Sequence, residues 1–348
     1  MTGIGSLDAH LLAHGRYTSP MASLNRADVI EVQGAASSGK SHFVYHMLMR
    51  CIMPSTIGGL DIGGWGKAAV ILDTDGTFDV QRLQHLLSVR LRAVNEASQS
   101  STMQASGQAH RDLVDLCLQR LHIFRPESST QLVVTLVNLP QYHAKILPNN
   151  EMALVVIDSI SAFYWPDRFT AEQMRQGTET SRSGGKQPAS LAHPLHNVFV
   201  ALERFRKSHA AVVLLTNWGL TPLEGNVQFF HQHLHPFPAS SAPFYTAPKD
   251  HVPPAIHQPQ EAAHEGAVSA SSGQAYPRIS HHITLRPQTV RPLAARLTLG
   301  EALEQESKLR NEAVRHRQIV GLVTTAGSPP GIVGRFTMHI DDDEVVMR

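Results

Sequence analysis

The segment from Gly34 to Ser41 constrains the fold of this chain more than any other part of the sequence. It matches the eight-residue phosphate-binding loop (P-loop) pattern at every required position. The loop consists of Gly34, Ala35, Ala36, Ser37, Ser38, Gly39, Lys40 and Ser41. In such a loop backbone N–H groups turn toward phosphate oxygens, Lys40 reaches the β and γ phosphates of ATP, and the Ser41 hydroxyl binds Mg²⁺. The motif therefore predicts an ATP site between a strand and a helix, and the alternatives are a chance glycine-rich turn or a loop that has lost nucleotide binding.

A second carboxylate-bearing element fits the same site. Leu154 to Ile157 form an apolar run that ends in Asp158, which is where a Walker B aspartate follows a buried strand. A strand-end aspartate alone is a weak signal, because such residues also cap strands. Together with the P-loop, Asp158 is predicted to hold Mg²⁺ with Ser41.

Short apolar runs alternate with longer amphipathic ones along the chain. This alternation predicts an α/β fold with a mostly parallel central sheet flanked by helices. The expected strands are Val29 to Gln33, Val70 to Leu72, His122 to Phe124, Ala153 to Ile157 and Ala211 to Thr216. Arg335 to Met347 is expected to form a closing hairpin.

Composition divides the chain into four parts. Residues 1–28 are a short extension, residues 29–216 the ATP-binding core, and residues 279–348 strands that complete the core. Between them, residues 217–278 are read as a disordered insertion, because Pro222 to His282 holds nine prolines and eight histidines with few aliphatic residues. Asn95 to His110 and Ala171 to Ser190 are rich in Ser, Gly and Gln and are expected to be flexible loops.

Charge and cysteine content exclude several classes of protein. The formal net charge of +1 creates no strong field toward nucleic acid or anionic lipid, so any contact with DNA is expected to be local or shared with partners. Two cysteines provide no disulfide framework, which indicates a reducing compartment. No stretch approaches the roughly 18 apolar residues of a membrane span, and no secretory signal is visible, so we expect an intracellular protein without a membrane partner.

Three further segments resemble RecA-like recombinases. Leu72 to Phe78 resembles the segment after their second core strand, and Asp158 to Trp165 resembles their Walker B continuation. Val212 to Asn217 resembles the strand that leads into their second DNA-binding loop. Within this class the chain most resembles the eukaryotic recombinase paralogues. The resemblance implies a RecA-like P-loop core, a nuclear role in double-strand break repair by homologous recombination, and other recombinase paralogues as partners, with weak or shared contact to single-stranded or branched DNA.

Two positions depart from the pattern of that family. The resemblance places Asp75 where a glutamate commonly positions the attacking water, and the aspartate carboxylate is about one methylene shorter. It also places Trp218 where active recombinases have a glutamine that senses the γ phosphate. We therefore expect slow hydrolysis, with Asp75 as the catalytic residue, and ATP binding that is not coupled to DNA binding.

These departures favour an ATP-binding assembly subunit over the alternative, an active DNA-dependent ATPase with strand-exchange activity. A small-molecule P-loop kinase is a third possibility, but it leaves Asp73 to Phe78 unexplained. Filament-forming family members resemble one another in a Phe-containing linker before the core, and residues 1–28 contain no Phe. We therefore expect this chain to accept a neighbour's linker, not to donate one, and so to cap a short paralogue chain.

Two weaker features can be explained either by a binding function or by solvent-exposed segments without one. The loop after Asp158 carries Arg168, Arg175, Arg182 and Lys186, which could bind DNA phosphates or simply be a solvated loop. His231, His233 and His235 alternate as metal ligands could, although an unstructured histidine tract fits their Pro-rich surroundings better.

Overall fold

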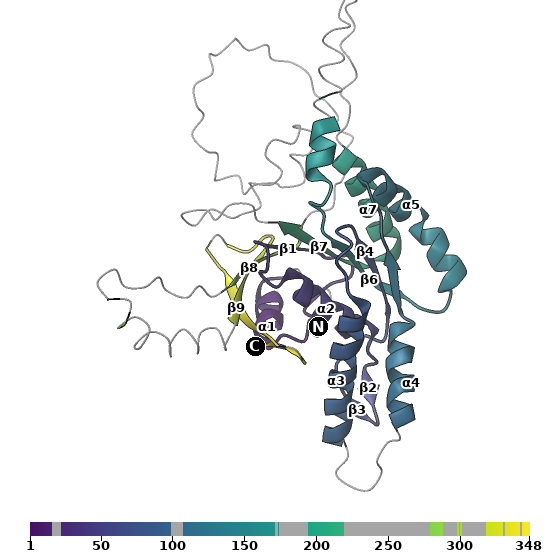
Figure 1. Cartoon of the computed structure of the whole chain (residues 1–348), viewed down its shortest axis with the longest axis vertical. Helices are drawn as coiled ribbons and strands as arrows, with labels where there is room; N and C mark the ends of the chain where they lie inside the picture. Colours follow the sequence, from purple (N-terminus) through teal and green to yellow (C-terminus); the bar gives the residue numbers. More distant parts are fainter. Residues whose placement is uncertain are drawn as a thin grey trace, which may run out of the picture.

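A nine-stranded sheet organises the structure (Figure 1), in the order β11-β10-β9-β8-β1-β7-β6-β4-β5. The computed structural model describes residues 1–15, 22–98, 107–170, 173, 194–218, 279–287, 298, 300, 318–329, 331–341 and 343–348. The six strands from β8 to β5 in this order are parallel. They are β1 (Val29–Gly34), β4 (Ala68–Asp73), β5 (Leu121–Phe124), β6 (Met152–Asp158), β7 (Val212–Trp218) and β8 (His281–Pro287). Their carboxyl ends therefore meet at one edge of the sheet.

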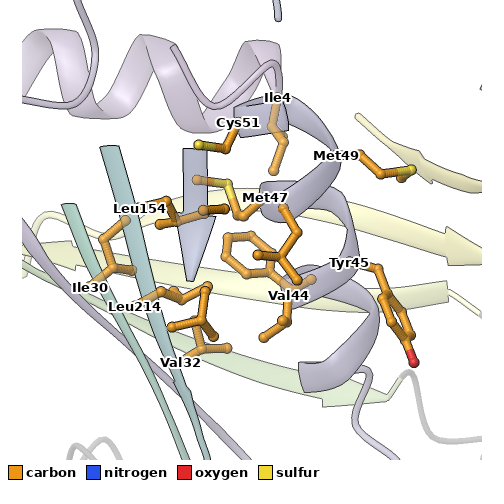
Figure 2. Packing of buried hydrophobic residues seen from close by; sticks show 14 of the residues in the cluster. Ile4, Ile30, Val32, Val44, Tyr45, Met47, Met49, Cys51, Leu154 and Leu214 are labelled. Carbon is orange, nitrogen blue, oxygen red and sulfur yellow. The ribbon is translucent and has the colours of Figure 1, made fainter. Parts of the chain in front are cut away.

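Helices cover both faces of the parallel strands. On one face α2 (Lys40–Ile52), α3 (Val80–Ser98) and α4 (Gly107–Leu118) close one apolar core, and on the other α5 (Ser129–Ile146) and α7 (Pro194–His209) close a second. Figure 2 shows Val44 and Met47 of α2 pointing toward Leu154 of β6 and Leu214 of β7. β1 and β4 are buried along their whole length. β4 is apolar from Ala68 to Leu72, as is typical of two-sided strands, whereas β1 also contains the buried polar residues Glu31 and Gln33.

The C-terminal strands extend the sheet in antiparallel fashion. β9 (Gln318–Thr325) pairs with β8, and β10 (Gly334–Ile340) lies between β9 and β11 (Val345–Met347). A two-stranded hairpin of β2 (Thr56–Ile57) and β3 (Leu60–Asp61) stands apart from the main sheet. The expected closing hairpin at Arg335 to Met347 is confirmed.

The N-terminal residues are packed into the core. Ile4, Leu7 and Leu11 are buried, the last two on α1 (Gly5–His14), which contacts β9 and β10. The Asp8 carboxylate accepts hydrogen bonds from the backbone N–H groups of Thr2 and Gly3. These hydrogen bonds hold the first residues of the chain against α1. The helix itself packs on β9 and β10.

The structure confirms the α/β class and all five expected parallel strands. The segment Asn95 to His110, predicted as a loop, is helical at both of its described ends, because α3 runs to Ser98 and α4 begins at Gly107. Both ends continue helices whose buried apolar residues lie before Asn95 or after His110, so the amphipathic spacing of each helix outweighs the polar composition of its end. The predicted insertion and the histidine cluster lie outside the described residues beyond Trp218. In the described part of the chain, no helix is long and apolar enough to cross a membrane.

His46 should make stability depend on pH. Its Nε2 lies 3.0 Å from the Thr2 carbonyl oxygen, and burial lowers the pKa of the ring from 6.5 to about 4. The unfolded chain therefore takes up the proton first, so the stabilisation is complete above pH 6.5 and is lost as the pH falls through 4. We expect the unfolding free energy to drop by about 1 to 2 kcal/mol over this interval because of His46, less than the full shift implies, since the residue is only half-buried. Denaturant unfolding of the native chain and His46→Gln across this range should give a flatter pH profile for the variant, and parallel profiles would contradict the assignment.

Candidate nucleotide-binding site

The P-loop joins the end of β1 to the start of α2, as its sequence predicts. A Cβ on Gly34 would lie 2.2 Å from Ser38 Oγ and 2.8 Å from the Leu285 carbonyl oxygen, so this position has room only for glycine. Gly39 and Ser37 adopt positive φ values of 89° and 59°, which turn the backbone around the loop. Ala35, Ala36 and Ser37 are exposed at the tip, where a ligand could reach their N–H groups.

Lys40 lies at the first position of α2 and is 8% exposed. Its Nζ donates hydrogen bonds to the Gly34 and Ala35 carbonyl oxygens at 2.9 and 2.8 Å. Burial lowers the pKa of Lys40, while the charges of Asp158 and Asp75 raise it. These interactions place the lysine between the phosphate-binding loop and the carboxylates of the site.

Asp158 is the last residue of β6 and is 5% exposed. The Thr216 hydroxyl on neighbouring β7 donates a short hydrogen bond to Asp158 Oδ1. Burial raises the pKa of Asp158, and this hydrogen bond opposes the rise. Such a carboxylate benefits from a cation, either the Lys40 ammonium or a metal ion.

Asp75 lies in the turn that follows β4, close to Asp158. The Thr74 N–H donates to the Asp158 carbonyl oxygen at 2.9 Å, and the Thr74 hydroxyl donates to the Ser159 carbonyl oxygen at 2.7 Å. Burial raises the pKa of Asp75, and a hydrogen bond with Ser159 lowers it. The structure therefore brings Lys40, Asp75 and Asp158 together at one edge of the sheet.

These residues fit a phosphate ligand with a hard metal ion. Ser38 Oγ is buried and has no hydrogen-bond partner among the described residues. Ser41 is exposed at the first turn of α2, and the helix N-terminus adds a positive partial charge. The described residues contain no cluster of three or more His, Cys, Asp or Glu side chains able to hold a metal by themselves. A metal here would depend on ligand oxygens, with the serine hydroxyl and one carboxylate from the protein, as Mg²⁺ prefers in phosphate sites.

Comparison with known proteins relates this core to DNA repair proteins. No protein-family model matches the chain. It is 32% identical over 193 residues to DNA repair protein XRCC2 of Mus musculus, covering 56% of each protein. It is 27% identical over 212 residues to the XRCC2 homolog of Arabidopsis thaliana, covering 56% of this chain and 55% of the homolog. DNA repair and recombination protein RadA of Methanoculleus marisnigri is 24% identical over 190 residues, which cover 54% of this chain and 48% of RadA.

The core is RecA-like. These matches confirm the resemblance to recombinase paralogues on which the sequence interpretation was based. The matched region spans only about half the length of each relative.

Several site residues were not anticipated from the sequence. Asp73 and Thr216 are buried beside Asp75 and Asp158, and Arg125 forms an ion pair with Asp73. The sequence did contain a signal for these three site residues, because each of them lies at or just beyond the end of an expected strand. A Cβ on Gly39 would lie 2.5 to 2.6 Å from the side chains of Met338 and Ile319. Side chains of the C-terminal strands therefore pack directly against the P-loop, which no local sequence pattern predicts.

The end of β7 lies next to the segment that follows Asp158. Trp218 is 50% exposed, and its backbone N–H donates to the Ser161 hydroxyl at 3.1 Å. Arg168 lies over the Trp165 ring at 5.7 Å, and Trp165 is 60% exposed. The other basic residues of the predicted DNA-binding loop, Arg175, Arg182 and Lys186, lie outside the described residues.

Gly34→Ala should disrupt the P-loop. The new Cβ would overlap Ser38 Oγ and approach the Leu285 carbonyl, so either the loop or β8 must shift. We expect a loss of about 1 to 3 kcal/mol in unfolding free energy, measured by denaturant titration. Gly5→Ala is the matched control, because its Cβ meets nothing within 4 Å and it lies in α1, where alanine is tolerated. Equal stability of the two variants would contradict the close packing at Gly34.

Proposed function

We infer that this chain is an ATP-binding recombinase paralogue that acts as an assembly subunit in DNA double-strand break repair by homologous recombination. The observation that carries the proposal is the meeting of Lys40, Asp75 and Asp158 at the end of a complete P-loop, in a core similar to proteins named for DNA repair. The similar proteins of Mus musculus and Arabidopsis thaliana are named for DNA repair, which supports the nucleus as the site of action in a eukaryotic cell.

ATP and Mg²⁺ are the proposed ligands. Backbone N–H groups of Gly34 to Ser41 would surround the phosphates, and Lys40 would leave the carbonyls of Gly34 and Ala35 to contact the β and γ phosphates. Ser41 and Asp158 would hold the Mg²⁺, which neutralises phosphate charge when bound. Asp75 would orient the attacking water.

Slow turnover follows from the same geometry. Asp75 has a shorter carboxylate than the family glutamate, and its backbone is fixed to β6 by neighbouring hydrogen bonds. Trp218 has a single N–H donor on its ring in place of the amide of glutamine. Bound ATP would then persist and stabilise an interface, which suits an assembly subunit.

The edge of the sheet at β5 supports binding of another paralogue. β5 is the last strand in the sheet order, and each of its four residues is partly exposed. An edge strand offers backbone hydrogen-bonding groups to an extended segment of another chain. A partner's linker strand would find this surface beside α5.

An active DNA-dependent ATPase with strand-exchange activity is the second candidate. The observation that favours it is that Lys40, Asp75 and Asp158 all remain in place around the phosphate site. The two candidates differ in turnover, which the variants below measure.

Lys40→Ala tests nucleotide binding and its link to assembly. Loss of the charged contact should weaken binding of a labelled ATP analogue by about 1.5 to 3 kcal/mol, or roughly 10- to 150-fold. Recovery of other recombinase paralogues in affinity purification from cells should fall in parallel. Lys67→Ala is the control, because Lys67 precedes β4 at the opposite end from the site and pairs with Glu151. Unchanged ATP binding would identify a degenerate loop, and unchanged partner recovery would refute the assembly role of ATP.

Asp75→Glu tests the cause of slow hydrolysis. The longer side chain should bring its carboxylate closer to the attacking water and raise single-turnover hydrolysis in the assembled complex, by up to about 100-fold. Asp75→Asn is the matched control and should abolish any hydrolysis that the native complex shows. An unchanged rate in Asp75→Glu would show that Trp218, not the short carboxylate, limits turnover.

A further inference from the structure

The turn that carries Asp75 is held from two sides. On its inner side, the Thr74 backbone and hydroxyl are bonded to the end of β6. On its outer side, the Asp73 carboxylate accepts hydrogen bonds from the N–H groups of Thr77 and Phe78 at 3.1 and 3.3 Å. Asp73 thus closes the turn into a ring of hydrogen bonds with Asp75 at its tip.

Asp73 itself depends on a cation. Its side chain is 1% exposed, and a buried carboxylate without a charged partner is strongly disfavoured. Arg125 Nε donates to Asp73 Oδ2 at 3.2 Å, and the same guanidinium reaches the Phe78 carbonyl oxygen at 3.5 Å. One arginine therefore holds both ends of the closed part of the turn.

The sheet register places this arginine beside the turn. β4 and β5 are parallel neighbours with Leu72 opposite Phe124, so Asp73 and Arg125 are the next residues on the two strands. The Arg125 side chain is 61% exposed, and an ordinary surface ion pair of that exposure contributes about 0 to 1 kcal/mol to stability. This pair differs from an ordinary one because its carboxylate is buried and organises the backbone that presents Asp75.

We propose that Arg125 is a positioning residue that acts through Asp73 to hold the Asp75 turn against the end of β6. The proposal rests on the proposed function, because Asp75 has a role only if ATP is bound and hydrolysed at this site. Arg125 does not contact the nucleotide in this arrangement. Its removal should let the turn move, so that Asp75 is misplaced while the P-loop still binds ATP.

The test is steady-state ATP hydrolysis by the full chain purified with its paralogue partners, together with ATP-analogue binding and thermal unfolding. Arg125→Gln should lower kcat by about 10-fold or more, with KM changed by less than about 2-fold, because misplacement of a reacting group affects the chemical step. Arg125→Lys should restore part of the rate, since one ammonium can hold the Asp73 carboxylate without the guanidinium fork. Lys67→Gln removes another partly exposed ion pair, far from the site, and should leave kcat unchanged.

The outcomes distinguish a failure of the proposed function from a failure of the positioning role of Arg125. A native complex that binds no ATP analogue overturns the proposed function. A native complex that binds ATP, but hydrolyses it no faster than the complex with Lys40→Ala, overturns the positioning role of Arg125. The proposal of ATP binding then remains intact. A fall in ATP affinity equal to the fall in kcat, or a large loss of thermal stability in Arg125→Gln, would mean that Arg125 serves only the fold.

Discussion

The parallel register of four strands controls the chemistry of this molecule. β1, β7, β6 and β4 end at the same edge of the sheet, and this places Lys40 beside Asp158 and Asp75. Burial shifts the pKa of each of these groups toward its neutral form. Attraction between Lys40 and the two carboxylates opposes the shift, whereas the charge of Asp75 adds to the rise in the pKa of Asp158. Because the strands are fixed by two apolar cores, the charged groups cannot move apart to recover solvent. The site is therefore prepared for a ligand that brings both phosphate and metal.

Much of this site could be predicted from the sequence because its signals are local. The P-loop pattern fixed Gly34 to Ser41, and the apolar run before Asp158 identified the carboxylate at the end of β6. Similar runs predicted the other parallel strands, since strands buried on both faces are mostly apolar, although β1 also buries Glu31 and Gln33. The prediction that Asp75 is the catalytic carboxylate rests only on a family resemblance, because nothing in its immediate neighbours specifies such a role.

What the sequence did not reveal depends on tertiary contacts. Ile4, Leu7 and Leu11 recur at helical spacing, but nothing in the local sequence indicates that α1 packs against β9 and β10. The contact of Gly39 with Met338 and Ile319 joins positions about 300 residues apart, and only the fold brings them together. Arg125 follows a short strand and resembles any surface arginine until the β4–β5 register places it beside Asp73.

The restraint on the Asp75 turn bears on why a short carboxylate could be retained there. On the proposed function, a free turn would let the Asp75 carboxylate occupy many positions, few of which could orient the attacking water. Here the Thr74 hydroxyl donates a hydrogen bond to the chain at the end of β6, and Asp73 binds both Arg125 and the backbone of the turn. The backbone that carries Asp75 therefore has little freedom to move. On the proposed function, the rigid turn would hold the carboxylate in one orientation, and its shorter side chain would keep it farther from the attacking water than a glutamate would. On the proposed function, such a site would favour long-lived ATP over rapid turnover, which is what a nucleotide-stabilised interface between paralogues requires.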